Sequence, residues 1–219
     1  MTVAIEADRL TKRYRAEQRD GPGVLAVDRV NFSVAAGEVF GFLGPNGAGK
    51  TTTLRILTTL TRITSGRALV MGHDVATERL TVRRLIGIVP EVSNVYDEYS
   101  AWDNLLFTAR LYGMARRLRE ERATLLLQQF DLWDRRASRA AEFSKGMRRR
   151  LCLAMGLVHQ PRVLFLDEPT SGLDVQSARA IRDTVRALKA AGTTVFLTTH
   201  NMDEAARVCD RVAIIHHVS

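Results

Sequence analysis

The chain has 219 residues, of which 46% are hydrophobic and 26% charged, and this globular composition excludes disordered and fibrous proteins. Its 32 lysines and arginines exceed its 24 acidic residues, and the resulting net charge of +8 is compatible with an anionic partner without selecting one. Two cysteines, Cys152 and Cys209, are too few for a disulfide framework or a metal cage, so we expect a reducing compartment.

Segments rich in β-forming residues begin the chain and predict a small antiparallel sheet. They are Val3–Ile5, Val24–Val27 and Asn31–Val34. A strand of the buried type, Glu38–Leu43, then leads into the glycine-rich stretch Gly44–Gly49. The helical pattern that follows places Leu54, Leu57 and Leu60 on one face.

The rest of the chain is predicted to alternate between strands and helices. Further strands are expected at Arg67–Met71 and Ile86–Val89, and a helical region runs from about Trp102 to Gln160. There follow strand Val163–Leu166, helix Val175–Ala191, strand Thr194–Thr198, helix Asn201–Val208 and strand Val212–Ile215. This alternation predicts an α/β fold with a mostly parallel sheet covered on both faces, a small antiparallel β part and an inserted α-helical part.

A loop between the strand Glu38–Leu43 and the next helix fits the pattern G-x-x-x-x-G-K-[ST]. Its glycines let backbone N–H groups converge on phosphate oxygens, and the helix N-terminus adds its own unpaired N–H groups. Lys50 would supply charge to the β- and γ-phosphates, and Thr51 would offer a hydroxyl to Mg²⁺. The predicted nucleotide-binding residues here are Gly44, Pro45, Asn46, Gly47, Ala48, Gly49, Lys50, Thr51 and Thr52.

Two adjacent carboxylates, Asp167 and Glu168, follow the apolar strand Val163–Leu166. We expect Asp167 to reach a metal ion directly or through water, and Glu168, which points differently, to take a proton from an attacking water. For an isolated pair, two solvated acids at a strand end would be the commoner explanation. The phosphate loop upstream favours a Mg²⁺–nucleotide site instead.

Three more segments complete an ordered set of motifs: Phe143–Met147, where Ser144 is placed as a helix N-cap, Ser171–Asp174, and His200 at a strand end. Their order and spacing resemble the ATP-binding cassette (ABC) ATPase domain over nearly the whole chain. The resemblance implies a P-loop NTPase core of the RecA-like type in one domain, residues 1–219.

That resemblance also implies how the single domain is divided. The core and β subdomain would take residues 1–90 plus 160–219, and a helical subdomain would take about 91–159. ABC domains usually continue past the last strand predicted here, so we expect the C-terminus at Ser219 to be a truncation.

In the ABC family two cassettes pair head to tail, which implies that each nucleotide lies between one phosphate loop and the signature helix of a second copy. Ser144 and Gly146 would then contact the γ-phosphate bound by the other copy. Asp174 would carry contacts between the two sites. His200 would position the water that Glu168 activates.

Four positions call for separate comment. Tyr14 lies where the family places an aromatic ring on adenine, although a lone tyrosine there could be an ordinary strand residue. Glu91 replaces the usual Gln: its carboxylate could bind Mg²⁺, but it adds negative charge near the γ-phosphate. Lys145 and Met147 replace the common Gly and Gln, and with Glu91 they resemble the branch that powers multidrug, antibiotic and sodium export.

The resemblance implies an ATPase that uses ATP and Mg²⁺ as a subunit of an ABC exporter. ATP-driven closure of a head-to-tail dimer would act on a separate integral membrane permease from the cytoplasmic face of the membrane. No apolar run in the sequence approaches the roughly 18 residues of a membrane span, so we expect the permease to do the crossing.

The alternative is a soluble ABC ATPase acting on nucleic acid or ribosomes, which the charge of +8 allows. We expect nucleic acid not to be a partner, and DNA or RNA binding that weakens steeply with salt would contradict this.

Two groups of side chains in the helical region leave their roles open. Tyr96, Tyr99 and Trp102 could anchor the permease or fill the helical core. Arg148, Arg149 and Arg150 fall on three faces of one helix, so we expect at least one of them to be solvated.

Overall fold

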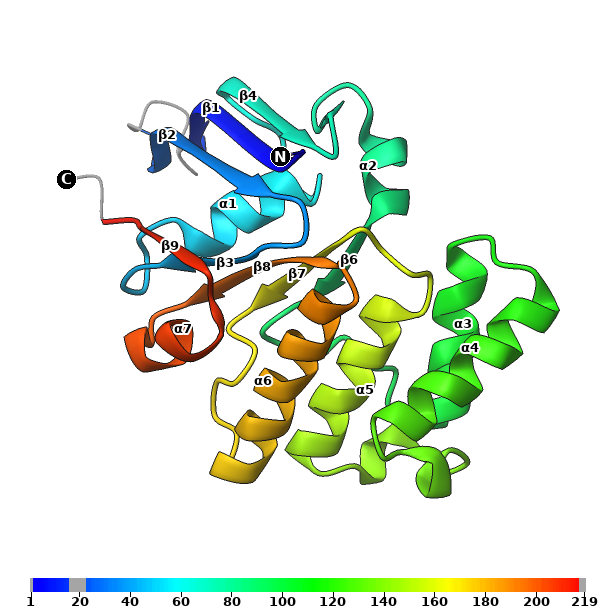
Figure 1. Ribbon diagram of the computed structural model, residues 1–219. Helices are drawn as coiled ribbons and strands as arrows, with labels where there is room; N and C mark the ends of the chain where they lie inside the picture. The colour runs from blue at the N-terminus through cyan, green and yellow to red at the C-terminus, as the bar shows by residue number, and fades with distance from the viewer. Residues whose placement is uncertain (1, 16–22, 217–219) are drawn as a thin grey trace.

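The computed structural model describes residues 2–15 and 23–216, and Ser219, at the predicted truncation, lies outside them. Two sheets form the centre of the molecule (Figure 1). The antiparallel sheet has the order β2 (Leu25–Ala35), β1 (Val3–Arg13), β4 (Ser65–Val70) and β5 (His73–Asp74). The parallel sheet has the order β6 (Ile86–Val89), β7 (Val163–Asp167), β8 (Thr194–Thr199), β3 (Val39–Leu43) and β9 (Arg211–Ile214).

The antiparallel sheet is confirmed, with one change to its predicted strands. The segments Val24–Val27 and Asn31–Val34, predicted separately, fall in the single strand β2, except that Val24 lies one residue before it. Irregular register between β1 and β2 interrupts the alternation of inward and outward residues, and Arg29 at this point has φ 44°. The predicted strand at Arg67–Met71 is β4, which pairs antiparallel with β1.

Alternating side chains of the parallel strands build two hydrophobic cores, one on each face. In β7, Val163 and Phe165 point into the core shared with the antiparallel sheet, whereas Leu164 and Leu166 point into the core under the long helices. Every residue of β7 is buried, as expected for a parallel strand covered on both faces. Rings from both sheets meet in the first core: Phe32, Phe40, Phe42 and Phe196.

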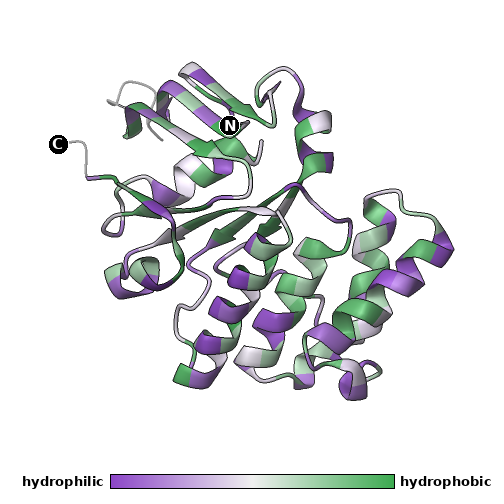
Figure 2. Cartoon of the chain, viewed as in Figure 1, coloured by the Kyte–Doolittle hydropathy of each residue, from purple (hydrophilic) through white to green (hydrophobic). Residues whose placement is uncertain are grey.

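Helices cover both faces of the parallel sheet (Figure 1). Between the two sheets lies α1 (Lys50–Leu57), and on the opposite face lie α5 (Lys145–Leu157) and α6 (Val175–Ala190). At the edges lie α2 (Arg79–Leu85) and α7 (Met202–Val208). Green apolar segments run through the strands, while the outer faces of the helices are mostly purple (Figure 2).

The predicted helical region between β6 and β7 contains three α-helices: α3 (Ala101–Leu111), α4 (Arg116–Gln129) and α5. Two short 3₁₀ turns, Trp133–Arg135 and Ala140–Glu142, join α4 to α5. Across residues 2–15 and 23–216, no helix combines the length and the apolarity that a bilayer crossing requires.

One detail of the predicted first helix is wrong. Leu60 does not share a face with Leu54 and Leu57, because α1 ends at Leu57 and Leu60 is 59% exposed. The hydroxyl of Thr58 donates to the carbonyl oxygen of Leu54 at the helix end, and Thr59 has φ 62°, which breaks the helical path.

The direction of the parallel strands positions the functional site. Leu43 of β3 pairs with Thr199 of β8, and Asp167 of β7 pairs with Thr198, so the carboxyl ends of these strands meet at one edge of the sheet. Loops that leave this edge are the usual place for ligands in open α/β sheets.

Candidate functional site

The glycine-rich loop after β3 approaches other backbone segments too closely for a side chain at two of its glycines. A Cβ placed on Gly44 would lie 2.3 Å from the carbonyl oxygen of Ile215, and one on Gly49 would lie 2.3 Å from that of Ala26. Gly49 also has φ 100° and no side chain to cap α1. The first N–H groups of α1 therefore have no capping side chain and can bind an anion.

Lys50 lies at the start of α1 and is only 6% exposed. Its ammonium Nζ donates to the carbonyl oxygens of Gly44 at 2.7 Å and Pro45 at 3.2 Å, and it lies 3.6 Å from Oε1 of Glu168. The positive charge is thus held between the loop and the carboxylate that follows β7, within reach of an anionic ligand.

The acidic pair at the end of β7 is divided between two environments. The carboxylate of Asp167 accepts a hydrogen bond from the Thr198 hydroxyl, and its Oδ1 lies 3.4 Å from Oγ1 of Thr51. Glu168 adopts a left-handed backbone with φ 44°, and its Oε1 lies 3.0 Å from Nδ1 of His200. The two carboxylates thus have different hydrogen-bond partners, although they belong to adjacent residues.

These oxygens fit the requirements of Mg²⁺. Thr51 and Asp167 offer a hydroxyl and a carboxylate side by side, the hard donors that this ion takes when phosphate and water oxygens complete its shell. Within the described part of the chain, no group of three or more His, Cys, Asp or Glu side chains could hold a metal ion alone. The two-ligand arrangement therefore suits an ion that arrives with a nucleotide.

A cavity of about 370 Å³ collects most of the predicted residues. It is lined by Ala26, Asn46, Gly47, Gly49, Lys50, Thr51, Thr52, Glu91, Glu168, Ser171 and His200. Sequence reasoning missed Ala26 and did not single out Ser171, although Ser171 belongs to a segment that it had selected. Nothing in the sequence around Ala26 indicated that β2 approaches the phosphate loop.

Other predicted residues do not line this cavity. Pro45, Ala48 and Asp167 lie directly beside lining residues along the chain, and Gly44 lies two residues before the lining Asn46. Tyr14 is not among the lining residues: its N–H donates to the carbonyl oxygen of Val24, two residues before the lining Ala26, and the ammonium of Lys12 lies 4.8 Å from the centre of its ring. The predicted contact of Tyr14 with adenine stays a prediction.

The signature residues form a second surface at the N-termini of α5 and α6. Ser144 caps α5 by accepting the N–H of Met147 at 3.2 Å, and Asp174 caps α6 by accepting the N–H of Ser177 at 2.8 Å. The hydrogen bonds that Ser177 donates to Asp174 hold the pKa of the Asp174 carboxyl below its usual value. A Cβ on Gly146 would lie 2.5 Å from the Ser177 hydroxyl, so the two helix ends are in close contact.

The arginine run on α5 contradicts the expectation of a solvated member. Arg148 pairs with Asp97 at 2.6 Å, and Arg150 donates to the carbonyl oxygen of Phe130 at 3.0 Å; both are partly buried. Arg149 is buried against the loops that follow β6 and β7. Each arginine thus has its own partner. The sequence could not show which of the three is buried, because they are identical neighbours.

The aromatic residues after Glu91 divide between the two roles left open. Tyr96 and Tyr99 are exposed and pack edge-on against Phe107, whereas Trp102 is partly buried and packs against Trp133 and the helical core. Only the two tyrosines therefore remain available as surface contacts.

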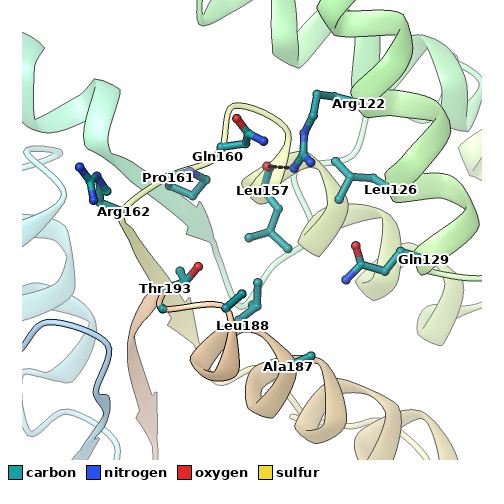
Figure 3. A pocket seen from close by; sticks show the side chains of 12 residues that line it. Arg122, Leu126, Gln129, Leu157, Gln160, Pro161, Arg162, Ala187, Leu188 and Thr193 are labelled. Atoms are coloured by element: carbon teal, nitrogen blue, oxygen red, sulfur yellow. Dashed lines mark hydrogen bonds between the residues drawn. The ribbon is translucent and has the colours of Figure 1, made fainter.

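A second hollow, of about 360 Å³, lies between the helices at the other end of the strands (Figure 3). Within the described residues, none of the predicted site residues lines it. Arg122, one of two arginines in its lining, donates to the carbonyl oxygens of Leu157 at 3.1 Å and Val158 at 3.3 Å. Arg122 thus satisfies the C-terminal end of α5, which is a structural role.

A family model described as ABC transporter matches residues 27–171. The chain is 46% identical over 216 residues to the daunorubicin/doxorubicin resistance ATP-binding protein DrrA of Streptomyces peucetius, covering 99% of this chain and 63% of that protein. It is 42% identical over 193 residues to the Nod factor export ATP-binding protein I of Rhizobium sp., covering 88% of this chain and 64% of that protein. It thus spans somewhat less than two thirds of the length of these curated relatives.

Solved structures agree with the fold. The ATP-binding subunit of an ABC transporter superimposes with a TM-score of 0.83 at 30% identity, covering 97% of this chain and 86% of that one. The dimeric bacterial ABC transporter cassette MJ0796 superimposes with a TM-score of 0.86 at 26% identity, covering 97% of this chain and 94% of that one.

Proposed function

The chain belongs to the ABC transporter family, and from that premise we propose that it is the ATP-binding and ATP-hydrolysing subunit of an exporter. The observation that carries the proposal is the convergence of Lys50, Glu168 and His200 on one cavity beside Thr51 and Asp167. A charge for the phosphates, a proton acceptor and a group that orients it are the components that phosphoryl transfer to water requires.

In the proposed reaction the phosphates of ATP lie on the N-terminus of α1. Lys50 exchanges its carbonyl partners for the β- and γ-phosphate oxygens, which neutralises their charge. Thr51 and Asp167 would hold Mg²⁺, which adds further charge neutralisation at the phosphates when bound. Glu168 accepts the proton of the attacking water while His200, hydrogen-bonded to the same carboxylate, fixes its orientation.

We propose that a second copy of the chain completes each site. Ser144 and Gly146 belong to a surface separate from their own cavity, and Ser144 is exposed. In a head-to-tail pair, the N-terminus of α5 would meet the γ-phosphate held by the other copy, and Asp174 would lie between the sites. The dimeric structure of a related cassette supports such pairing.

Two further contacts with the nucleotide belong to the proposal. Tyr14 would stack on adenine, which requires the base to reach beyond the cavity toward β1. Glu91 lines the cavity and would act on the metal or its water, with its extra negative charge weakening the site relative to a Gln.

We also propose the division into a core and β subdomain, 1–90 plus 160–219, and a helical subdomain, about 91–159. A surface groove of about 610 Å³ lies where the two parts meet, with exposed apolar residues from the loop after α1, from α2 and from α3: Leu60, Leu80 and Leu111. Ile86 and Ile88 of β6 line it as well, and β6 leads directly to Glu91. We assign this groove to a helical segment of a separate membrane permease, and the chain would then act at the cytoplasmic membrane face.

The test is phosphate release from Mg²⁺–ATP by the purified chain at increasing protein concentration. Turnover per chain that rises with concentration supports a composite site, and turnover that is absent at every concentration contradicts the proposed activity. Binding of DNA or RNA that weakens steeply between low and high salt would instead support the alternative of a nucleic-acid ATPase.

The groove is tested separately by a double substitution of Leu80 and Leu111 to Glu, compared with wild type. The fraction of the chain that sediments with membranes containing its permease should fall several-fold, while Mg²⁺–ATP turnover in solution stays within twofold. Unchanged sedimentation would contradict the assignment of the groove.

A further inference from the structure

Arg149 makes an unusual set of contacts behind the cavity. It lies in the second turn of α5, is 7% exposed, and directs its whole guanidinium at backbone carbonyl oxygens. Nε donates to Pro169 at 2.9 Å, and NH2 donates to Asp167 at 2.9 Å and Glu168 at 3.2 Å. NH1 donates to Pro90 and lies 3.5 Å from the oxygen of Glu91. One side chain thus joins the segment after β6 to the segment after β7.

Burying the guanidinium charge of Arg149 costs free energy, which indicates that its contacts with the carbonyl oxygens are important. In the described residues, no carboxylate lies within salt-bridge distance of Arg149, so carbonyl dipoles alone satisfy it. Burial lowers the pKa of its guanidinium, although arginine remains protonated in proteins. A buried cation without a paired carboxylate is expensive. A planar fork of donors, which lysine and glutamine lack, is the chemical feature that these carbonyls use.

The segment that Arg149 holds includes the strained residue of the site. Glu168 has φ 44°, a left-handed conformation that costs free energy for a residue with a side chain. Its carbonyl oxygen and those on either side all accept from Arg149, while its N–H donates to the carbonyl oxygen of Thr198 at 3.1 Å. The guanidinium therefore acts on the backbone that aims the Glu168 carboxylate.

We propose that Arg149 is a positioning residue that fixes the Glu168 backbone and ties it to the Glu91 segment and to the helix headed by Ser144. The inference rests on the proposed function, because it assigns Glu168 and Ser144 the roles given above. Engagement of Ser144 by the nucleotide of a second copy would move α5, and Arg149 would carry that movement to the proton acceptor of its own chain. The two sites of a dimer would thereby be coupled through a rigid helix.

The experiment compares Arg149→Gln and Arg149→Lys with Arg150→Gln, a matched change one residue along the same helix. Each chain is tested for its melting temperature, its dissociation constant for ATP and its kcat with Mg²⁺–ATP. We expect Arg149→Gln to lower kcat by about tenfold to hundredfold, because small displacements of a reacting group have effects of this size. Its dissociation constant should change less than threefold, because none of the hydrogen bonds that Arg149 makes reaches the phosphate loop.

Arg149→Lys keeps the charge but cannot bridge both segments, so its kcat should lie between those of Arg149→Gln and wild type. Arg150→Gln should retain wild-type kcat. The inference is overturned if Arg149→Gln or Arg149→Lys keeps wild-type kcat, or if kcat and ATP affinity fall in parallel. If Arg149→Gln does not fold, the same criteria apply to Arg149→Lys. A wild-type chain that binds ATP without hydrolysing it would instead contradict the proposed function.

Discussion

The phosphate-loop cavity and the surface at the N-termini of α5 and α6 are organised in opposite ways. In the cavity, Lys50 and Glu168 are buried, contact each other and bring their charges to one point. At the surface, Ser144 and Asp174 are exposed, and their side chains accept hydrogen bonds from the N-termini of their own helices. The first region is assembled by the fold of one chain, whereas the second presents two helix ends outward.

This difference indicates which functional steps a single chain can perform. Binding of phosphate needs only groups that the parallel sheet brings to its edge, and these are already in place. In the proposed composite site, the surface at the N-termini of α5 and α6 would contribute to the reaction only when a second copy brings a phosphate to it. Variants in the first region should therefore act at any protein concentration, and variants in the second only where copies associate.

The largest effect is expected from Glu168→Gln in the cavity. The substitution keeps the size of the side chain and its contact with His200 but removes the proton acceptor, so kcat should fall about 10²- to 10⁴-fold. ATP affinity should be preserved. The measurement is phosphate release alongside a direct binding isotherm.

The matched control is Glu204→Gln, another buried acid, which accepts from the Thr199 hydroxyl at 3.2 Å outside the cavity lining. Its turnover should remain close to wild type. A Glu168→Gln chain with turnover within fivefold of wild type would remove this residue from the role of proton acceptor.

Lys50→Ala should give the next largest effect, on binding. Two or more charge-assisted hydrogen bonds to phosphate are lost, which corresponds to an ATP dissociation constant raised by about a hundredfold. Titration calorimetry at low protein concentration measures it. Lys145→Ala provides the comparison, because Lys145 lies beside Gly172 at the second surface. Equal losses of ATP affinity in the two variants would contradict the difference proposed between the cavity and the second surface.

Ser144→Ala sharpens the comparison at the second surface. Loss of an N-cap should lower the melting temperature by a few degrees, and turnover at high protein concentration should fall about tenfold because the γ-phosphate loses a hydroxyl. Ser100→Ala is the control, since Ser100 caps α3 by accepting the N–H of Asp103 at 3.0 Å. Equal turnover in these two variants would show that Ser144 is only a cap.

Much of the fold and of the cavity could be predicted because the relevant signals are continuous in sequence. The apolar runs of β3, β7 and β8 are each followed by their functional residues, so the parallel sheet alone brings Gly49, Glu168 and His200 together. The helix α2 was missed because its N-cap, Glu78, makes no capping hydrogen bond and its residues carry no clear apolar face.

What could not be predicted depends on contacts between distant segments. The three neighbouring arginines of α5 are chemically identical, and only tertiary packing assigns Arg149 to the carbonyls behind the acidic pair. Likewise, no local pattern indicates that Ala26 of β2 approaches the phosphate loop, where its carbonyl oxygen would lie 2.3 Å from a Cβ on Gly49.

The smallest effect is expected from Asp174→Asn, which keeps a capping side chain but removes its charge. Hydrogen bonds from Ser177 lower the pKa of the Asp174 carboxyl in the folded chain, so the unfolded chain binds its proton more readily. The stabilisation is therefore present at neutral pH and is lost as pH falls through about 4 and below.

Wild type should melt a few degrees above the variant at pH 7, because the carboxylate lies at the positive end of α6. The gap should close by about pH 3, and ATP affinity at low protein concentration should be equal in the two chains. A gap that persists at pH 3 would assign the difference to packing and not to charge, whereas lower ATP affinity in the variant would join this surface to the cavity of its own chain.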